Sequence, residues 1–336
     1  MTQLFINPEV DDYFVEYEFP GTTDESDQRI RQSIVDDYAD EKIILLRKLQ
    51  FDADLKFLRS VNFYQKWKWK KLALSDFEVI PAKKRRGNPE IAEFVQDVFN
   101  GDWGRFDYFM EQATIVNDRI RTILDTIYKN YRFSLRNIIW RFTETRVENM
   151  HFDLDRNCDD LELIRLYFNL DEIPRIWYTA GTFTAMANEW YRKLDLGRFR
   201  GQSHDKLLKE LTTRVFGGWN SRGRDKVPRH LILFEPGDVW LTDGRLVSHQ
   251  VIYGRRVVSS LFAAKLSAVP DPRKTFAQKM EDLHQLQEKF KDQPESSIPA
   301  NRFRKETSAP QSRPVDLRSS WEELSEHIRR DTLVRL

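Results

Sequence analysis

The chain has 336 residues, of which 40% are hydrophobic and 32% charged, and its net charge is +1. This composition is typical of a soluble globular protein of roughly one to three domains, and the near-neutral charge argues against an extended nucleic-acid footprint. The one cysteine, Cys158, excludes an intrachain disulfide and a cysteine-based metal site.

Hydrophobic spacing and capping residues predict a series of helices and strands along the chain. They are a helix near 27–38, a strand over 42–51, a short helix from Asp52 to about 61, a helix over 88–100, a long amphipathic helix over 106–127, strands over 161–170, 175–179, 230–234 and 239–242, and helices over 275–291 and 317–336. The long helix is expected to pack outside a sheet.

Differences in composition and in predicted secondary structure divide the sequence into three parts. Residues 1–41 are acidic and predict an N-terminal extension. Residues 42–270 predict a domain whose β-rich core spans about 133–266 and contains a helical insertion at about 182–213. Residues 271–336 predict a helical C-terminal extension that is partly disordered, because it includes a stretch rich in Pro, Ser and charge.

No apolar run approaches the ~20 residues that cross a bilayer, and the amino terminus lacks a basic region followed by an apolar core. We therefore expect a cytoplasmic protein. Two basic runs, Lys66–Lys71 and Lys83–Arg86, allow two interpretations. They are either a half-exposed edge strand and a solvated loop, or they attract an anionic substrate or a lipid head group.

His151 and Asp153 form a His-x-Asp pair that can bind a metal ion. Side chains two residues apart on a strand point to the same face, so an extended segment directs both into one cavity. An imidazole and a carboxylate so placed are two thirds of the 2-His-1-carboxylate triad that holds non-haem Fe(II) in oxygenases.

A second motif follows much later in the chain. Pro236–Asp238 predicts a tight turn, after which an apolar strand and a second polar turn lead to His249. The residues beyond predict a hairpin that turns near Gly254 and Arg255.

Side chains alternate between the two faces of that hairpin, and this alternation predicts a cosubstrate contact. Ser260 lies opposite His249, and Arg256 lies on the same face as His249. An arginine there can bind the distal carboxylate of a dicarboxylic cosubstrate through two hydrogen bonds. A register slip of one residue would substitute Arg255.

This order of elements resembles the Fe(II)/2-oxoglutarate-dependent dioxygenases. Within that superfamily the chain looks most like the Kdo (3-deoxy-D-manno-oct-2-ulosonic acid) hydroxylases, which oxidise a sugar of lipopolysaccharide. The resemblance covers roughly residues 42–270 and rests on three stretches, Met150–Asp153, Ile164–Trp177 and Pro236–His249. It implies an α+β fold built on a double-stranded β-helix (a cupin-like, distorted jelly roll), with flanking helices and helical N- and C-terminal extensions.

The same resemblance implies a site. Iron would be bound by His151, Asp153 and His249, with 2-oxoglutarate and O2 as co-reactants; a requirement for ascorbate stays open. The carboxylate of Asp153 favours hydroxylation, because related halogenases have a small residue at that position. Arg165 interrupts an apolar strand and is either a second candidate for the 2-oxoglutarate carboxylate or a structurally paired arginine. Arg175 and Asn169 are weaker candidates for contacting substrate or cosubstrate.

The function implied is hydroxylation of a C–H bond, of a Kdo sugar of lipopolysaccharide or lipid A. Alternatives are the same chemistry on another small molecule such as a natural-product intermediate, a nucleic-acid or protein hydroxylase, and a metal-free jelly-roll binding module. The expected partner is a small molecule or a glycolipid and not nucleic acid. Peripheral contact with the inner membrane stays open beside the cytoplasmic location.

Overall fold

The computed structural model describes residues 2–19, 26–61, 67–69, 71–146, 148–155, 157–218 and 227–293. Within these ranges eleven strands form a single sheet. They are β1 (Gln3–Phe5), β2 (Phe14–Glu18), β3 (Ile43–Arg47), β4 (Lys71–Ala73), β5 (Phe133–Arg146), β6 (Leu161–Ile164), β7 (Leu166–Asn169), β8 (Arg175–Thr179), β9 (His230–Phe234), β10 (Val239–Leu241) and β11 (Gln250–Lys265).

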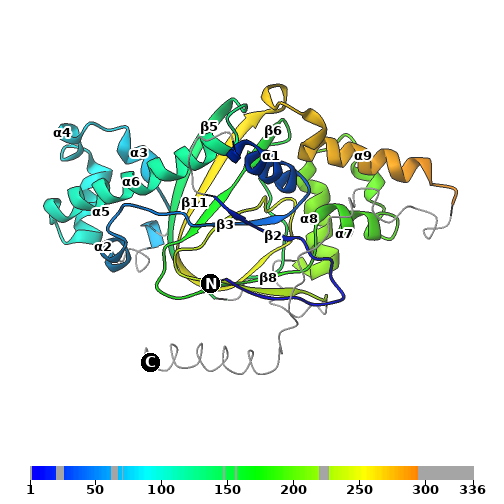
Figure 1. Cartoon of the computed structure of the whole chain (residues 1–336), viewed down its shortest axis with the longest axis horizontal. Coiled ribbons are helices and arrows are strands. Elements are labelled where there is room, and N and C mark those ends of the chain that lie inside the picture. Colours follow the sequence, from blue (N-terminus) through cyan, green and yellow to red (C-terminus); the bar gives the residue numbers. More distant parts are fainter. Residues whose placement is uncertain are drawn as a thin grey trace.

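Helices flank this sheet on both sides (Figure 1). They are α1 (Ser26–Ala39), α2 (Leu55–Ser60), α3 (Leu74–Glu78), α4 (Ala82–Arg85), α5 (Pro89–Phe99), α6 (Trp103–Ile127), α7 (Phe183–Trp190), α8 (His204–Phe216) and α9 (Phe276–Lys289). None of them combines the length and the apolar character needed to cross a membrane.

The long strand β11 organises the sheet. One of its edges pairs with β5 along most of its length, and its other edge pairs in turn with β8, β7 and β6. The outer strands continue from this centre, β9 and β1 beyond β8, and β10, β3 and β2 beyond β7. All of these pairs are antiparallel except β2 with β3.

The sheet curls into a half-barrel (Figure 1). Phe234 of β9 and Trp240 of β10 belong to strands that reach β11 through β8 and β7, at places about five residues apart along the same edge of β11, which is about 17 Å in a flat sheet. Their rings nevertheless stack with centroids 3.9 Å apart, and Trp177 of β8 contacts the same Trp240 ring at 5.5 Å. These aromatic side chains therefore fill the inside of the curl, and the predicted α+β fold with a curled sheet and flanking helices is confirmed.

Alternate residues of β3 pack into two different hydrophobic cores. Ile44 and Leu46 of β3 pack with apolar side chains of α5 and α6 on the outside of the curl, as predicted for the long amphipathic helix. Ile43 and Leu45 of the same strand pack inside, in a core that also includes Trp177 and side chains of α7, α8 and α9. This alternation follows from the two-residue period of a strand.

The N-terminal residues differ from the extension predicted over 1–41. β1 pairs with the outer edge of β9, and β2 adds in parallel to β3. These short strands cover edges that would otherwise expose unpaired backbone groups. The structure thus places the described N-terminal residues in the same sheet as the predicted domain.

Several local predictions can be compared directly. The short helix α2 is capped by Asp54, whose side chain accepts from the N–H of Phe57 at 2.9 Å, and not by Asp52. The strand predicted over 161–170 is interrupted at Arg165. The helical insertion is observed as α7 and α8, and the charged helix as α9, whereas the helix predicted over 317–336 lies outside the described residues.

Candidate metal centre

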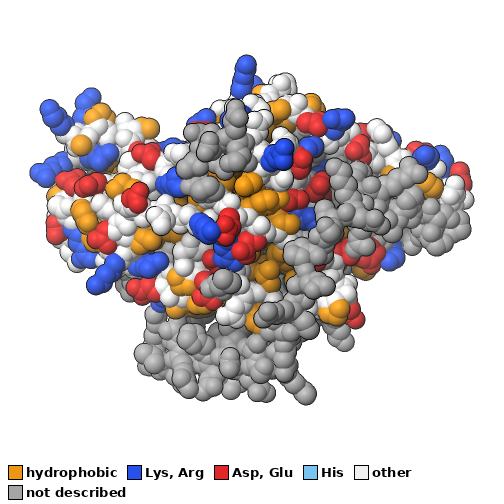
Figure 2. Space-filling model, viewed as in Figure 1, with side chains coloured by type: hydrophobic (Ala, Val, Ile, Leu, Met, Phe, Trp, Pro, Cys, Tyr) orange, Lys and Arg blue, Asp and Glu red, His pale blue; other side chains and the backbone are white. Residues whose placement is uncertain are grey.

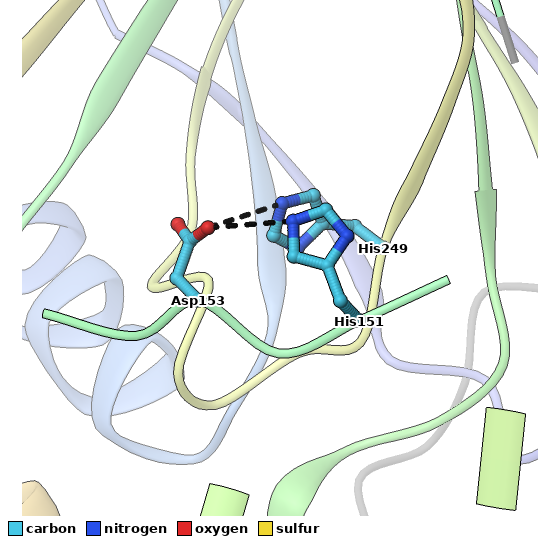
Figure 3. Close-up of side chains that lie close together, drawn as sticks. All are labelled: His151, Asp153 and His249. Carbon is cyan, nitrogen blue, oxygen red and sulfur yellow. Dashed lines mark ion pairs between the residues drawn. The ribbon is translucent and has the colours of Figure 1, made fainter. Parts of the chain in front are cut away.

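Two segments that are far apart in the sequence bring the three predicted ligand residues together. His151 and His249 form an antiparallel bridge in which each backbone N–H donates to the other's carbonyl, at 3.0 and 2.9 Å. Two residues further on, the N–H of Asp153 donates to the carbonyl of Gly244 at 2.8 Å. As a result the Asp153 carboxylate faces both imidazole rings (Figure 3).

The three ligand atoms are spaced for a single ion. Oδ1 of Asp153 lies 3.6 Å from Nε2 of His151 and 3.7 Å from Nε2 of His249. Two metal–ligand bonds of about 2.1 Å span up to about 4.2 Å, so one ion can join the carboxylate to either ring. All three residues offer a ligand atom within 4.8 Å of the others, and two imidazoles with one carboxylate match the donor set of non-haem Fe(II).

Backbone carbonyls determine which nitrogen of each imidazole is free. Nδ1 of His151 donates to the carbonyl of Asn149 at 2.7 Å, and Nδ1 of His249 donates to the carbonyl of Val247 at 3.2 Å. Because a carbonyl only accepts, Nδ1 carries the hydrogen and Nε2 keeps its lone pair for a cation. The two rings are therefore oriented as metal ligands.

Burial and mutual charge set the protonation of the triad. Burial opposes the ionisation of Asp153, but the guanidinium of Arg165 and the two imidazoles outweigh it and hold the pKa of this carboxyl well below its usual range. Burial lowers the pKa of His249 to about 4. For His151, the hydrogen bond and the charge of Asp153 outweigh burial and raise the pKa. An ionised carboxylate and a neutral imidazole are the forms that bind metal.

Arg165 fixes the orientation of the Asp153 carboxylate. Its Nη1 lies 3.2 Å from Oδ2 of Asp153, which leaves Oδ1 facing the histidines. Its Nη2 donates to both oxygens of Asp155, at 2.6 and 2.7 Å, and its backbone N–H donates to the hydroxyl of Tyr38 at 2.9 Å. Of the two interpretations of Arg165, the geometry favours the structurally paired arginine.

Gly244 lies so close to the triad that no side chain fits there. A Cβ atom at this position would lie 2.2 Å from Oδ2 of Asp153 and 2.9 Å from Cε1 of His249. The sequence analysis missed this residue, although its place in the polar turn before His249 was a signal. It also missed Trp177, whose indole stacks on the His249 ring with centroids 5.1 Å apart and an interplanar angle of 24°.

The predicted hairpin near Gly254 and Arg255 is wrong. β11 runs without a turn from Gln250 to Lys265, with a bulge between Gly254 and Arg256 in its pairing with β5. Without the hairpin, the strand parity on which the predicted position of Arg256 depended does not apply.

The predicted cosubstrate contacts on β11 have other partners. Arg255 and Arg256 both form ion pairs with Asp171, at 3.0 and 3.3 Å. The Arg256 guanidinium also lies over the ring of Phe142, in the outer core. The Ser260 hydroxyl accepts from the backbone N–H of Leu166 at 3.0 Å. The predicted placement of Arg256 on the face of His249 is therefore wrong.

A different arginine lies inside the curl. Arg175 is two residues before Trp177 on β8, so its side chain shares the face of the residue that stacks on His249. It is 6% exposed, its Nε has no hydrogen-bond partner, and no carboxylate of the described residues forms an ion pair with it. Burial lowers its pKa to about 10; the charge of Glu148 opposes this shift, and the charge of Arg141 adds to it.

No protein-family model and no curated protein sequence matches the chain. Solved structures do match it. Crystal structures of the Kdo hydroxylase KdoO, a non-haem Fe(II) alphaketoglutarate-dependent dioxygenase, in complex with succinate and Fe(III) or with alphaketoglutarate and Fe(III), align with a TM-score of 0.57 at 15% identity. Each alignment covers 81% of this chain and 95% of the other.

A cobalt(II) complex of the same hydroxylase aligns with the same TM-score at 14% identity. At this level of identity the match shows a common fold. It agrees with the resemblance that the three sequence stretches indicated.

Proposed function

We propose that this protein is a non-haem Fe(II)/2-oxoglutarate-dependent dioxygenase that hydroxylates a C–H bond. The observation that carries the proposal is the convergence of His151, Asp153 and His249, whose Oδ1 and Nε2 atoms are 3.6 and 3.7 Å apart. The fold shared with KdoO supports it, because structures of that protein hold iron with alphaketoglutarate or succinate.

Each residue of the centre has a distinct part in this proposal. His151, Asp153 and His249 would hold the iron on one face and leave the remaining positions open. When bound, the iron and 2-oxoglutarate supply the activation of O2. Arg165 keeps Oδ1 of Asp153 directed at the histidines, and the Trp177 indole shields one side of His249 from water.

Arg175 is the residue to which we assign the distal carboxylate of 2-oxoglutarate, in place of Arg256. A buried guanidinium without a carboxylate partner costs folding free energy unless a ligand supplies the negative charge. Arg256 already has that charge in Asp171. Arg141 of β5, whose Nε also lacks a partner and whose charge acts on Arg175, can contribute to the same anionic contact.

For the substrate we propose a Kdo sugar of lipopolysaccharide or lipid A. The observation that supports an acidic sugar is the substrate named for the structural neighbour. The basic run Lys83–Arg86 is not part of this argument. It forms α4 at one end of the molecule, where Figure 2 shows Lys and Arg side chains gathered, and Arg86 packs over Trp103 at the start of α6.

The test is an aerobic reaction with Fe(II), 2-oxoglutarate and a Kdo-containing lipid A precursor, in which succinate and the mass of the sugar lipid are followed together. We expect succinate matched by one added oxygen on the sugar, and neither product with H151A. Stoichiometric Co(II) binding, measured separately in wild type and H151A, reports the metal centre independently of any substrate.

A matched pair of variants tests the assignment of Arg175. Losing a charge-assisted contact worth about 1.5–3 kcal/mol should raise the KM for 2-oxoglutarate by about 10–100-fold in R175Q. R136Q, which removes an arginine whose side chain is 45% exposed, should leave it unchanged. Succinate formation with an unmodified sugar would refute the Kdo assignment alone. Absence of His151-dependent Co(II) binding would refute the dioxygenase and favour a binding module.

A further inference from the structure

A cavity of about 230 Å³ lies apart from the metal centre, on the outer side of the sheet. Its walls come from α1, from the carboxyl-terminal end of α6 with the turn that follows, and from residues 270–274 after β11. α1 lies beside this end of α6 (Figure 1). A cavity of this size holds several water molecules, since each occupies about 30 Å³ in the liquid, and so it can accept a small ligand.

Three cationic side chains line the cavity: Arg31, Lys129 and Lys274. Arg31 is 8% exposed, its Nε has no hydrogen-bond partner, and within the described ranges no carboxylate forms an ion pair with it. Lys129 likewise has no acidic partner among the residues that the structure describes, whereas Lys274 pairs with Asp36. The cavity is therefore lined by two positive charges without an ion pair in the described ranges, one on the nearly buried Arg31 and one on the exposed Lys129.

The other lining groups suit a polar anion. Gln28 and Asn130 offer carboxamide N–H donors at the rim, where the carboxamide of Gln32 already donates to Asp36 at 2.7 Å. The one lining carboxylate, Asp271, accepts from Nε of Arg273 at 2.9 Å and from Nη2 at 3.0 Å. Its charge is consequently balanced by an arginine that is outside the cavity lining.

We propose that this cavity is a second ligand site, which binds a small oxyanion through a phosphate or carboxylate group. A nearly buried guanidinium is expensive to desolvate unless an anion accompanies it. A phosphate or carboxylate between Arg31 and Lys129 would provide that anion through charge-assisted hydrogen bonds. The site is independent of the proposed dioxygenase chemistry, because no triad residue lines it.

Isothermal titration of the full-length, metal-free chain with inorganic phosphate and with malonate, at matched ionic strength, tests the proposal and distinguishes phosphate from carboxylate. At about 10 mM ligand, a site with a Kd of ~1 mM is nearly saturated. We expect saturable 1:1 binding of one probe by the wild type. R31Q should weaken it at least about tenfold, and V35W should abolish it by filling the cavity without changing charge.

Two variants serve as controls. K83Q removes one exposed lysine on α4 and should bind as the wild type does; R175Q, which removes the arginine inside the curl, shows whether the anion binds in the half-barrel instead. If neither probe binds the wild type, or if binding persists in R31Q, the proposal is overturned. Equal weakening by K83Q would indicate non-specific attraction, and loss in R175Q alone would locate the anion in the half-barrel; either result also overturns it.

Discussion

Replacing Gly244 by alanine should remove metal binding without disturbing the fold. The added Cβ would lie 2.2 Å from Oδ2 of Asp153 and 2.6 Å from its Cγ, whereas ordinary contacts begin at 3.4 Å. The carboxylate must therefore move by about 1.2 Å, and metal–ligand distances tolerate only about 0.2 Å. The backbone of Gly244 has no positive φ, so the alanine itself introduces no backbone strain.

The expected loss of affinity can be estimated from this displacement. Disturbing a group that merely orients a ligand typically costs about 10–100-fold in metal affinity, and here a ligand itself is displaced. We expect G244A to bind Co(II) at least about 100-fold more weakly than the wild type in isothermal titration. In the D153A background G244A should add little, because the two changes remove the same ligand.

The matched control is G87A. A Cβ at Gly87 would lie 3.7 Å from the carbonyl of Lys84, an ordinary contact, so its Co(II) affinity should equal that of the wild type. The melting temperature of each metal-free variant shows whether it is folded. Wild-type Co(II) affinity in a folded G244A protein would refute the steric argument and the placement of Asp153 beside Gly244.

Two further predictions concern buried charges. D171A leaves the paired guanidinium groups of Arg255 and Arg256 without their carboxylate and should lower the free energy of unfolding by about 3–5 kcal/mol in denaturant titrations; a loss below about 1 kcal/mol would contradict this. Burial raises the pKa of Glu162 from 4.5 to about 7. The folded state therefore binds the carboxyl proton of Glu162 more tightly than the unfolded state does, and the free energy of unfolding should fall by about 3 kcal/mol as pH rises from about 4.5 to 7. E162Q retains an acceptor for the N–H of Phe276 and should abolish that decline; an unchanged pH slope would show that Glu162 does not cause it.

Local sequence signals predicted the elements that depend on neighbouring residues. Asn88 precedes α5, which has Pro89 in its first turn as predicted, and the long helix predicted over 106–127 is observed as α6, which begins three residues earlier, at Trp103. His151 and Asp153 were identified because a two-residue spacing on an extended segment has one geometric consequence. In each case the relevant interaction lies within a few residues along the chain.

The contacts that sequence analysis placed wrongly depend on distant residues. A turn near Gly254 was predicted from its local pattern, but pairing with β5, β7 and β8 keeps β11 continuous and leaves only local register shifts along it. Gly254 instead allows Arg175 to approach, since a Cβ there would lie 2.4 Å from Nη1 of that arginine. The sequence alone could not indicate whether Arg175 or Arg256 lies inside the curl, because their positions depend on how β11 pairs with its neighbouring strands.

The strand order also has a consequence for folding kinetics. β11 follows all four strands with which it pairs, and the outer pairs β3–β10 and β1–β9 join segments that are still further apart in the sequence. Such non-local pairings form slowly, because chain entropy is lost before contacts are gained. His249 stands immediately before β11, so the metal centre is completed only when this last strand docks. A bound ion should therefore slow unfolding and leave the rate of folding almost unchanged.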